Sequence, residues 1–285
     1  MPVRIVHSKQ NARLKELRRA YARPGRDPHG LLVIEGPNLL GEVMHAGLRP
    51  VCVFVRVGDE GTFVSIDDLD ADDIDILIIP APLFDSIVQT ETPQPVAALV
   101  PMPSWSWDEV LNIRAGVAPL VLVLAGLQDP GNLGTILRSA EAFGATGVIS
   151  LPGTVSPWNP KAIRASAGSI FRVPYIESTA NECFAKLRSA GLRILTTAVR
   201  EAESITSSNL VGPIALLIGN EGNGVPEELA SLCEGSITIP TPGPVESLNA
   251  AVAASVLLYE AARQRATHAN PAARIKPAKQ ARGPR

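Results

Sequence analysis

The feature that most constrains the fold is an alternation of short apolar runs and helix-compatible segments in the second half of the chain. From residue 119 the apolar runs are PLVLVLA, GVISL, LRILTTAV, PIALLIG and SITIP, and most are separated by segments such as NLGTILRSAEAFG, PKAIRASAG and ANECFAKLRSAG. Strands that are apolar throughout are typical of parallel sheets buried on both faces, and helical connections are what such sheets require. The sequence therefore predicts an α/β fold in which helices cover a parallel sheet.

The first part of the chain repeats this alternation on a smaller scale. Residues 31–100 contain the runs LLVIEG, VCVFV, ILIIP and AALV, separated by segments such as PNLLGEVMHAG, which predicts a small α/β domain. A segment rich in Pro, Trp and Ser follows and is expected to be a linker. We therefore expect an N-terminal domain at 1–105, a linker at 106–117, a second domain at 118–265 and a basic, disordered tail at 266–285.

Composition indicates the cellular compartment and the class of protein to expect. Apolar residues make up 46% of the sequence, yet no apolar run approaches the ~18–20 residues of a membrane helix, and no secretory signal is evident. The three cysteines, Cys52, Cys183 and Cys233, are odd in number and far apart. They form neither a disulfide framework nor a metal-ligand pair, so we expect a reducing cytoplasm and no metal. Because the apolar runs are short, we also expect no membrane.

Basic residues gather at the two ends of the chain. The net charge is only −2, but residues 1–26 hold eight Lys and Arg with one acid, and residues 266–285 hold five with none. Such runs can simply be solvated surface. They can also approach a polyanion, because neutralising phosphates drives the binding of nucleic acids.

Three loops after apolar strands have unusual compositions: DPGNLG (129–134), GNEGNG (219–224) and PTPGPVESLN (240–249). In a parallel sheet, ligands bind beyond the carboxyl ends of the strands, where these loops should lie. The first loop lacks the G-x-G-x-x-G pattern of a dinucleotide site and the Gly-Lys-Ser/Thr of a P-loop. It could be only a tight turn. Alternatively, Asn132, a candidate helix N-cap, and Arg138 could face one cavity at the strand ends.

The other two loops also leave alternatives open. In the second, Glu221 is the single carboxylate among glycines and asparagines, which would let a ligand approach the backbone closely, although any Gly/Asn-rich turn looks similar. In the third, prolines fix the course of the chain before a long apolar helix. Ser247 or Asn249 could cap that helix or contribute to a site.

Four motifs occur in one order: GLQDPGNLGTILRSAEAFGATGV, IRASAGSIFRVP, ALLIGNEGNGVP and ITIPTPGPVESLNAAVAASVLLYE. Together they resemble the SpoU (TrmH-like) family of RNA ribose 2′-O-methyltransferases, within the SPOUT superfamily. The resemblance covers 117–265, and QNARLKELRRA and VIEGPNLLGEVMHAG resemble the family's RNA substrate-binding domain less distinctively. It implies a C-terminal trefoil knot, which ordinary topology rules would exclude. It also implies S-adenosyl-L-methionine as cofactor and a homodimer formed through the knotted domain.

Residue by residue, the resemblance implies three groups of functional positions. The cofactor contacts fall on Gly219, Ile239 and Leu248. The catalytic set falls on Asn132, Arg138, Glu221, Ser247 and Asn249. Lys161 and Arg164 are expected to contact RNA phosphates, although a salt-bridged surface helix would look the same. One departure is Thr241-Pro242, where the family commonly has methionine after the proline.

The residues limit the mechanism that this resemblance implies. Segment 117–265 contains no histidine, and a guanidinium stays protonated in proteins, so Arg138 is a poor formal base. We expect Arg138 to hold the target phosphate and stabilise the developing alkoxide as a cation. The expected substrate is ribosomal rather than transfer RNA. Two other classes remain: an RNA-binding protein without catalytic activity, and a nucleotide-dependent oxidoreductase, which the missing fingerprint disfavours.

Overall fold

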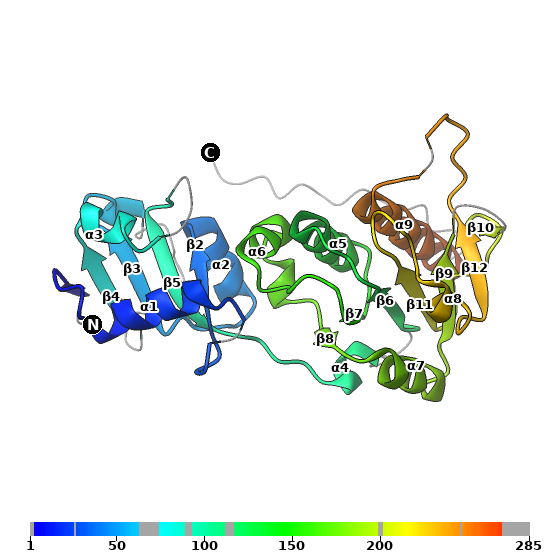
Figure 1. Ribbon diagram of the computed structural model, residues 1–285, viewed down its shortest axis with the longest axis horizontal. Coiled ribbons are helices and arrows are strands. Elements are labelled where there is room, and N and C mark those ends of the chain that lie inside the picture. Colours follow the sequence, from blue (N-terminus) through cyan, green and yellow to red (C-terminus); the bar gives the residue numbers. More distant parts are fainter. Residues whose placement is uncertain are drawn as a thin grey trace. The chain divides into compact units, whose positions relative to one another are not determined.

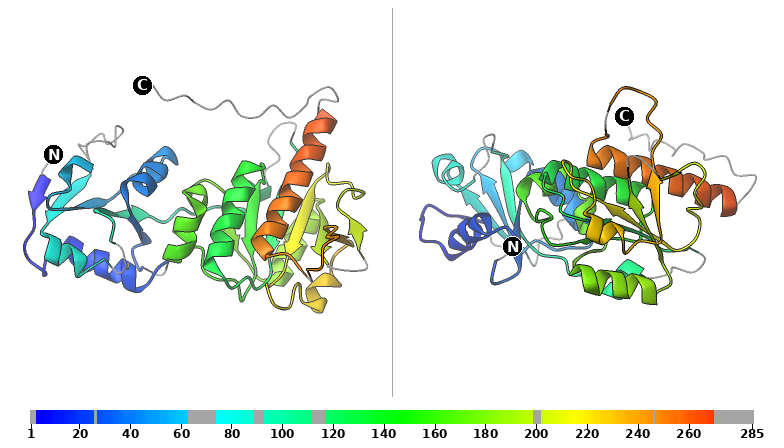
Figure 2. Two further views of the ribbon diagram at one scale, coloured as in Figure 1. Left: turned by 90° about the horizontal axis from the view of Figure 1, so that it is seen from above. Right: turned by 45° about the vertical axis from the view of Figure 1, so that its right-hand side comes forward.

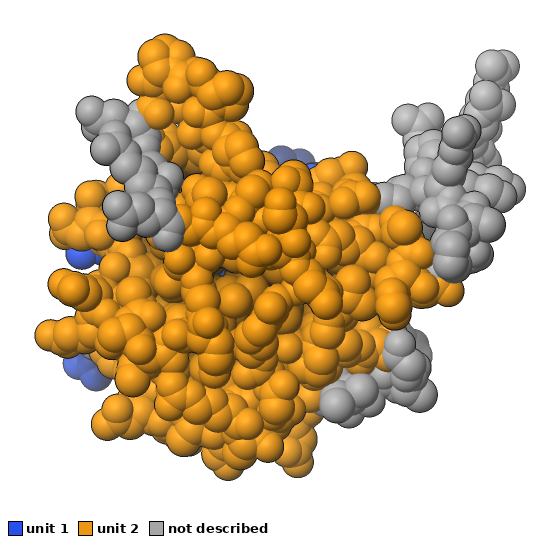
Figure 3. All heavy atoms as spheres, turned by 90° about the vertical axis from the view of Figure 1, so that its right-hand side faces the viewer, with its two compact units in different colours: residues 1–106, 128–138, 154–175 blue, residues 107–127, 139–153, 176–285 orange. Residues whose placement is uncertain are grey.

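The computed structural model describes residues 3–25, 27–62, 74–88, 93–111, 117–198, 202–245 and 247–269. The chain divides into two compact units, coloured separately in Figure 3. The first unit comprises residues 1–106, 128–138 and 154–175, and the second comprises residues 107–127, 139–153 and 176–285. Most of the predicted basic tail, from residue 270 onward, lies outside the described residues.

The first unit contains a five-stranded sheet with the order β1-β4-β3-β5-β2 (Figure 1). Its strands are β1 (Val3–Ile5), β2 (Leu31–Glu35), β3 (Cys52–Arg56), β4 (Asp75–Ile79) and β5 (Val96–Pro101). β1, β4 and β3 are mutually parallel, whereas β5 runs antiparallel to both β3 and β2. The accompanying helices are α1 (Ala12–Ala22), α2 (Pro37–His45), α3 (Ala81–Asp85) and the short 3-10 helix η1 (Glu60–Thr62). This is the small α/β arrangement that the apolar runs predict.

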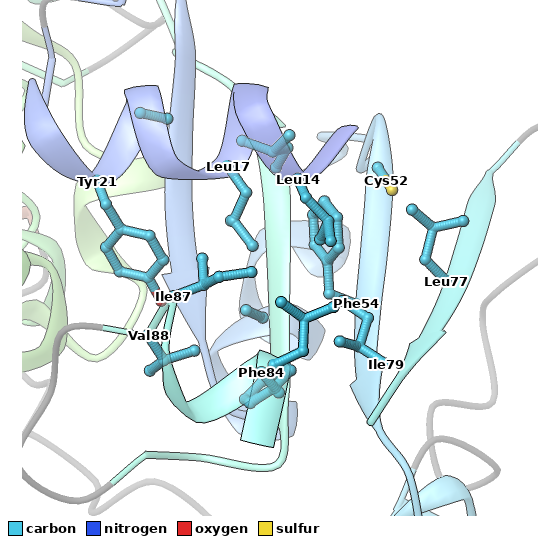
Figure 4. Packing of buried hydrophobic residues seen from close by; sticks show 14 of the residues in the cluster. Leu14, Leu17, Tyr21, Cys52, Phe54, Leu77, Ile79, Phe84, Ile87 and Val88 are labelled. Carbon is cyan, nitrogen blue, oxygen red and sulfur yellow. The ribbon is translucent and has the colours of Figure 1, made fainter. Parts of the chain in front are cut away.

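A hydrophobic core covers one face of this sheet (Figure 4). α1 begins at Asn11, whose side chain accepts from the backbone N–H groups of Arg13 and Leu14 and caps the helix. From there Leu14, Leu17 and Tyr21 recur at helical spacing, so one side of α1 is apolar and buried. That side packs with α3 residues against the strands, and Phe54 of β3 and Phe84 of α3 are among the largest fully buried side chains.

A seven-stranded sheet follows, with the order β10-β12-β9-β11-β6-β7-β8 (Figures 1 and 2). Its strands are β6 (Leu120–Leu124), β7 (Gly147–Ser150), β8 (Tyr175–Glu177), β9 (Arg193–Thr197), β10 (Glu203–Ser204), β11 (Ile214–Ile218) and β12 (Gly235–Thr238). The pairs from β10 to β7 are all parallel. β6 and β11 are buried at every position, which explains their continuously apolar sequences.

Helices and 3-10 turns connect these strands. They are α4 (Trp107–Leu111), α5 (Pro130–Ala142), α6 (Pro160–Ser166), η3 (Ser169–Phe171), α7 (Ala180–Ser189), α8 (Glu227–Ala230) and α9 (Ala250–Ala269). In the second unit, Val110 of α4 and Phe184 and Leu187 of α7 pack against one face of the sheet. The contact is so close that a Cβ at Gly147 would lie 2.7 Å from the Val110 side chain.

The Arg265 guanidinium helps to hold the C-terminal part of the last helix within the second unit. Arg265 donates hydrogen bonds of 2.5–3.1 Å to four backbone carbonyls, those of Ala118, Pro119, Leu210 and Gly212. Burial of this side chain lowers the pKa of Arg265 from its ordinary value. The C-terminal end of α9 is thereby attached to the start of β6 and to the loop before β11.

The predicted α/β fold class, with a parallel sheet preceded by a small α/β domain, is confirmed. Three local expectations differ from the structure. α4 forms within the expected linker, and the two-residue strand β10 has no sequence signal. α9 continues to Ala269, beyond the expected start of the tail. Within the described residues, no helix is long and apolar enough to cross a membrane.

Candidate functional site

A cavity of about 340 Å³ lies in the second unit, at the carboxyl ends of β9, β11 and β12. This is the edge of a parallel sheet at which ligands bind, and the volume suits a small organic ligand. Three segments supply most of its lining: 219–224 after β11, 237–241 around the end of β12, and 247–257, which enters α9. Gly219, Ile239 and Leu248, the three predicted cofactor contacts, all line this one cavity.

Gly219 is at a place where two backbone segments nearly touch. A Cβ there would lie 2.1 Å from the carbonyl carbon of Gly224, closer than real Cβ atoms come. The backbones of Asn220 and Gly224 exchange two hydrogen bonds of 2.9 Å, which closes the loop on itself. Glycine at 219 is therefore required by the fold of the loop as well as by its place on the cavity wall.

Asn220 organises this loop, a role not predicted from the sequence. Its Oδ1 accepts from the N–H groups of Gly222 at 2.8 Å and Asn223 at 3.3 Å, and its Nδ2 donates to the carbonyl of Gly126 at 2.8 Å. The loop after β11 is thus joined to the loop after β6. Asparagine in a glycine-rich turn favours this side-chain-to-backbone bonding, so the signal was present in GNEGNG.

The predicted catalytic residues of the second unit occupy different places. Glu221 and Ser247 are exposed side chains that line the cavity, as does Thr241, the departure from the family pattern. Asn249 instead caps α9, because its Oδ1 accepts from the N–H groups of Ala251 at 2.9 Å and Val252 at 3.2 Å. Of the two candidate caps, Asn249 is the one that the structure uses.

Asn132 and Arg138 lie on α5, in the part of that helix that belongs to the first unit. The prediction that Asn132 caps this helix is wrong. Asp129 lies before the first turn, and its Oδ1 accepts from the N–H of Gly131 at 2.6 Å. This bond, together with the neighbouring Lys161 ammonium, lowers the pKa of the Asp129 carboxyl. Asn132 is half-buried in the first turn and Arg138 is exposed.

The predicted RNA contacts lie on α6, next to α5 in the same unit. Gly134 allows the two helices to touch, since a Cβ there would lie 2.5 Å from the Ala162 carbonyl oxygen. Lys161 forms an ion pair with Asp129, with Nζ and Oδ1 3.0 Å apart, and both side chains are exposed. Arg164 is exposed. Four predicted RNA-side residues, Asn132, Arg138, Lys161 and Arg164, therefore belong to one unit.

The cysteines are poorly suited to nucleophilic chemistry. Burial raises the pKa of Cys52 and of Cys183 to about 12, and that of Cys233 to about 11. Among the described residues no group of three or more His, Cys, Asp or Glu side chains could hold a metal ion.

A parallel α/β sheet, a cavity at its carboxyl edge and an array of cationic and amide side chains on a second surface suit an RNA methyltransferase, and solved structures of that class match. An AdoMet-bound rRNA methyltransferase from Sinorhizobium meliloti has a TM-score of 0.77 and 26% identity, over 92% of this chain and 98% of that one. The SpoU methyltransferase AviRb from Streptomyces viridochromogenes, in complex with AdoMet, has a TM-score of 0.77 and 28% identity, over 90% and 98%.

Comparison with family models and with related proteins identifies the family to which the chain belongs. Residues 119–259 match the SpoU rRNA Methylase family, and residues 11–98 match the MRM3-like substrate binding domain. The uncharacterized tRNA/rRNA methyltransferase slr1673 of Synechocystis sp. is 34% identical over 91% of this chain and 93% of its own length. The 23S rRNA (guanosine(2553)-2′-O)-methyltransferase RlmP of Bacillus subtilis is 31% identical over 89% and 97%. The chain belongs to the SpoU rRNA methylase family, which confirms the resemblance predicted from the motifs.

Proposed function

We propose that this protein transfers a methyl group from S-adenosyl-L-methionine to a ribose 2′-hydroxyl of ribosomal RNA. The observation that carries the proposal is the cavity at the carboxyl edge of the second sheet, which gathers all three predicted cofactor contacts. Two solved relatives are described as bound to AdoMet, and RlmP is described as a 2′-O-methyltransferase of 23S rRNA. These descriptions favour ribosomal over transfer RNA as the substrate class.

The residues around the cavity suit this cofactor. Gly219 leaves the backbone of its loop open to a ligand, while Ile239 and Leu248 supply apolar surface for an aromatic base. Glu221 places a carboxylate on the wall, which can accept hydrogen bonds or attract a cationic group. S-Adenosylmethionine, when bound, supplies a methyl group already activated on a sulfonium. The protein's own contribution is to orient the acceptor and manage its charge.

Arg138 is assigned to the RNA acceptor. Its side chain is exposed, and as a permanent cation it can hold a phosphate and stabilise negative charge that develops on the 2′-oxygen. Asn132, six residues before it on α5, is assigned to orienting the ribose through its side-chain amide. Ser247 is assigned to the same task from the cavity wall. Asn249 is assigned to holding the 240–249 loop in place through the α9 cap.

The domain roles and assembly follow from the same proposal. We assign RNA recruitment to residues 1–105, with Lys161 and Arg164, and methyl transfer to 118–265, joined by 106–117. We assign a homodimer to the exposed side of α9, where the apolar residues Val252 and Tyr259 are about half exposed, at 50% and 49%. Among the described residues all three cysteines are free thiols, which is consistent with work in the cytoplasm.

The test is to map 2′-O-methylated nucleotides in total RNA from cells with and without the gene. We expect one or a few ribosomal positions to lose the modification. Purified protein with radiolabelled S-adenosylmethionine should then label the same position in unmodified ribosomal RNA. Loss of a transfer RNA position instead would reassign the substrate. Unchanged RNA in both experiments would overturn the methyltransferase proposal.

A further inference from the structure

Residues 154–175 of the family's methylase segment are tightly packed against the N-terminal α/β part of the first unit. Trp158 is only 9% exposed. A Cβ at Gly25 would lie 2.4 Å from Cδ1 of this indole, and Gly25 has φ +70°, which favours glycine. The indole therefore lies directly on the backbone just after α1, at a point where no other residue fits.

A second contact joins the same two parts near α2. Nη1 of Arg172 and Oε2 of Glu42 are 2.7 Å apart and form an ion pair. Gly168 lies against the same glutamate, since a Cβ there would be 2.6 Å from Cβ of Glu42. Gly168 also has φ +88°, so its backbone requires glycine on two counts. The segment is thus held at two separated points, Trp158 and Arg172.

The opposite side of this segment supports α5. The Ala162 carbonyl oxygen and the Ala165 Cβ would both lie 2.5 Å from a Cβ at Gly134, so the two helices touch at backbone distance. The Lys161–Asp129 ion pair joins α6 to the residue that caps α5. Close-packed interiors move as bodies rather than deforming continuously. Residues 130–138 of α5, with Asn132 and Arg138, therefore follow the position of 154–175.

We infer that Trp158 and Glu42 are positioning residues for methyl transfer. Through segment 154–175, the N-terminal substrate-binding part fixes Asn132 and Arg138, which the proposed function places at the RNA acceptor. This inference rests on that proposed function. Its consequence is that the N-terminal part contributes to kcat as well as to RNA affinity, because misplacing an orienting group by about 1 Å slows the reacting step.

The kinetic test uses the full chain with Glu42→Arg, Arg172→Glu, the double reversal, and Trp158→Ala. We expect Glu42→Arg and Trp158→Ala to lower kcat about tenfold at saturating RNA, with the Kd for S-adenosylmethionine unchanged. The double reversal should recover most of the kcat lost in Glu42→Arg, which a merely destabilised variant would not do.

The matched control is Asp85→Arg, since Asp85 forms a comparable exposed ion pair, with Arg56 at 3.5 Å, inside the N-terminal part. Unchanged kcat in both folded variants, or a change in the KM for RNA alone, would overturn the inference.

A second readout does not depend on activity. Amide hydrogen exchange across 130–138 should speed up in Glu42→Arg and Trp158→Ala, while exchange across 214–224 in the second unit stays unchanged. Exchange across 130–138 that matches the wild type would overturn the inference, even if the wild-type protein methylates no RNA. Failure of the proposed function would instead appear as a wild type without methyl transfer whose α5 still responds to both substitutions.

Discussion

Glycine is required at position 219 for two reasons. The loop folds back so closely on Gly224 that no side chain fits, and the backbone of Gly219 lines the cavity. We expect Gly219→Val to raise the Kd for S-adenosylmethionine at least tenfold, about 1.4 kcal/mol, because the side chain would displace the loop. Calorimetry on protein whose fold is verified by circular dichroism measures this. Gly212→Ala is the matched control, because nothing lies within 4 Å of its Cβ position. An unchanged Kd in the valine variant would separate the cofactor from this loop.

Arg138 tests the RNA side of the mechanism. Its substitution by alanine should lower kcat at least a hundredfold, about 2.7 kcal/mol, as for loss of one electrostatic contact to a developing oxyanion. The Kd for S-adenosylmethionine should not change, because Arg138 is not among the residues that line the cavity. Single-turnover methylation and calorimetry give the two numbers. More than about a tenth of the activity remaining, a barrier change below ~1.4 kcal/mol, would remove Arg138 from the catalytic role.

Asn249 is predicted to be a catalytic residue and is seen to cap α9, and two substitutions separate these roles. Aspartate is as good an N-cap as asparagine but cannot donate a hydrogen bond. If the amide N–H groups contribute, Asn249→Asp should keep the wild-type Tm and lose activity. Asn249→Ala should also lose about 1 kcal/mol of unfolding free energy. Full activity in a stable aspartate variant would leave Asn249 with the cap alone.

At the scale of elements, sequence periodicity predicted most helices and strands but not the way their ends are fixed. Asn132 and Asp129 are both good cap residues, and only the hydrogen bond from Gly131 shows that the helix begins at Pro130. The loops of the site were predictable, because unusual composition after an apolar strand marks the carboxyl edge of a parallel sheet. The bond from Asn220 to Gly126 was not, because the two residues are 94 positions apart.

Acid stability should depend on one turn that links α1 to β2. The Asp27 carboxylate is buried, which by itself would raise its pKa, but the bonds from Arg19 and from the N–H groups of His29 and Leu31 outweigh burial and lower it. A carboxyl with a depressed folded pKa stabilises fully above the unfolded pKa of about 3.9 and loses that contribution as pH falls through the folded value. Asp27→Asn should therefore lower the unfolding free energy by about 1–3 kcal/mol at pH 7. Urea titrations should show this difference shrinking below about pH 4. A constant difference down to pH 3 would contradict the assignment.

For the whole molecule, the sequence predicted two sheets and a two-part chain but not which segments belong together. Continuous apolar strands separated by helices identified the second sheet, and the order of motifs identified the family. The grouping of 128–138 and 154–175 with the N-terminal part has no local signal. It depends on the contact between Gly25 and Trp158. Hydrophobic periodicity does not connect these two residues, and in the sequence Trp158 looks like an ordinary loop residue. The trefoil knot likewise depends on how one segment of the chain passes through another, which periodicity does not predict. The knot was therefore expected from the family resemblance alone.

The homodimer is the last expectation to test, and α9 offers the surface. Val252 and Tyr259 are seven residues apart, so they lie on one side of the helix, and both are about half exposed. Phe143, which follows the end of α5, meets the Tyr259 ring edge-on, with centroids 5.9 Å apart, and extends the apolar area. Contiguous exposed apolar patches are one mark of a subunit interface. We expect light scattering to give a dimer for the wild type and a monomer for the doubly substituted Val252→Glu, Tyr259→Glu protein, because burying two carboxylates without partners is unfavourable. His268→Glu, an exposed position on another side of the same helix, should stay dimeric. A dimer that survives the double substitution at micromolar concentration would move the interface away from α9.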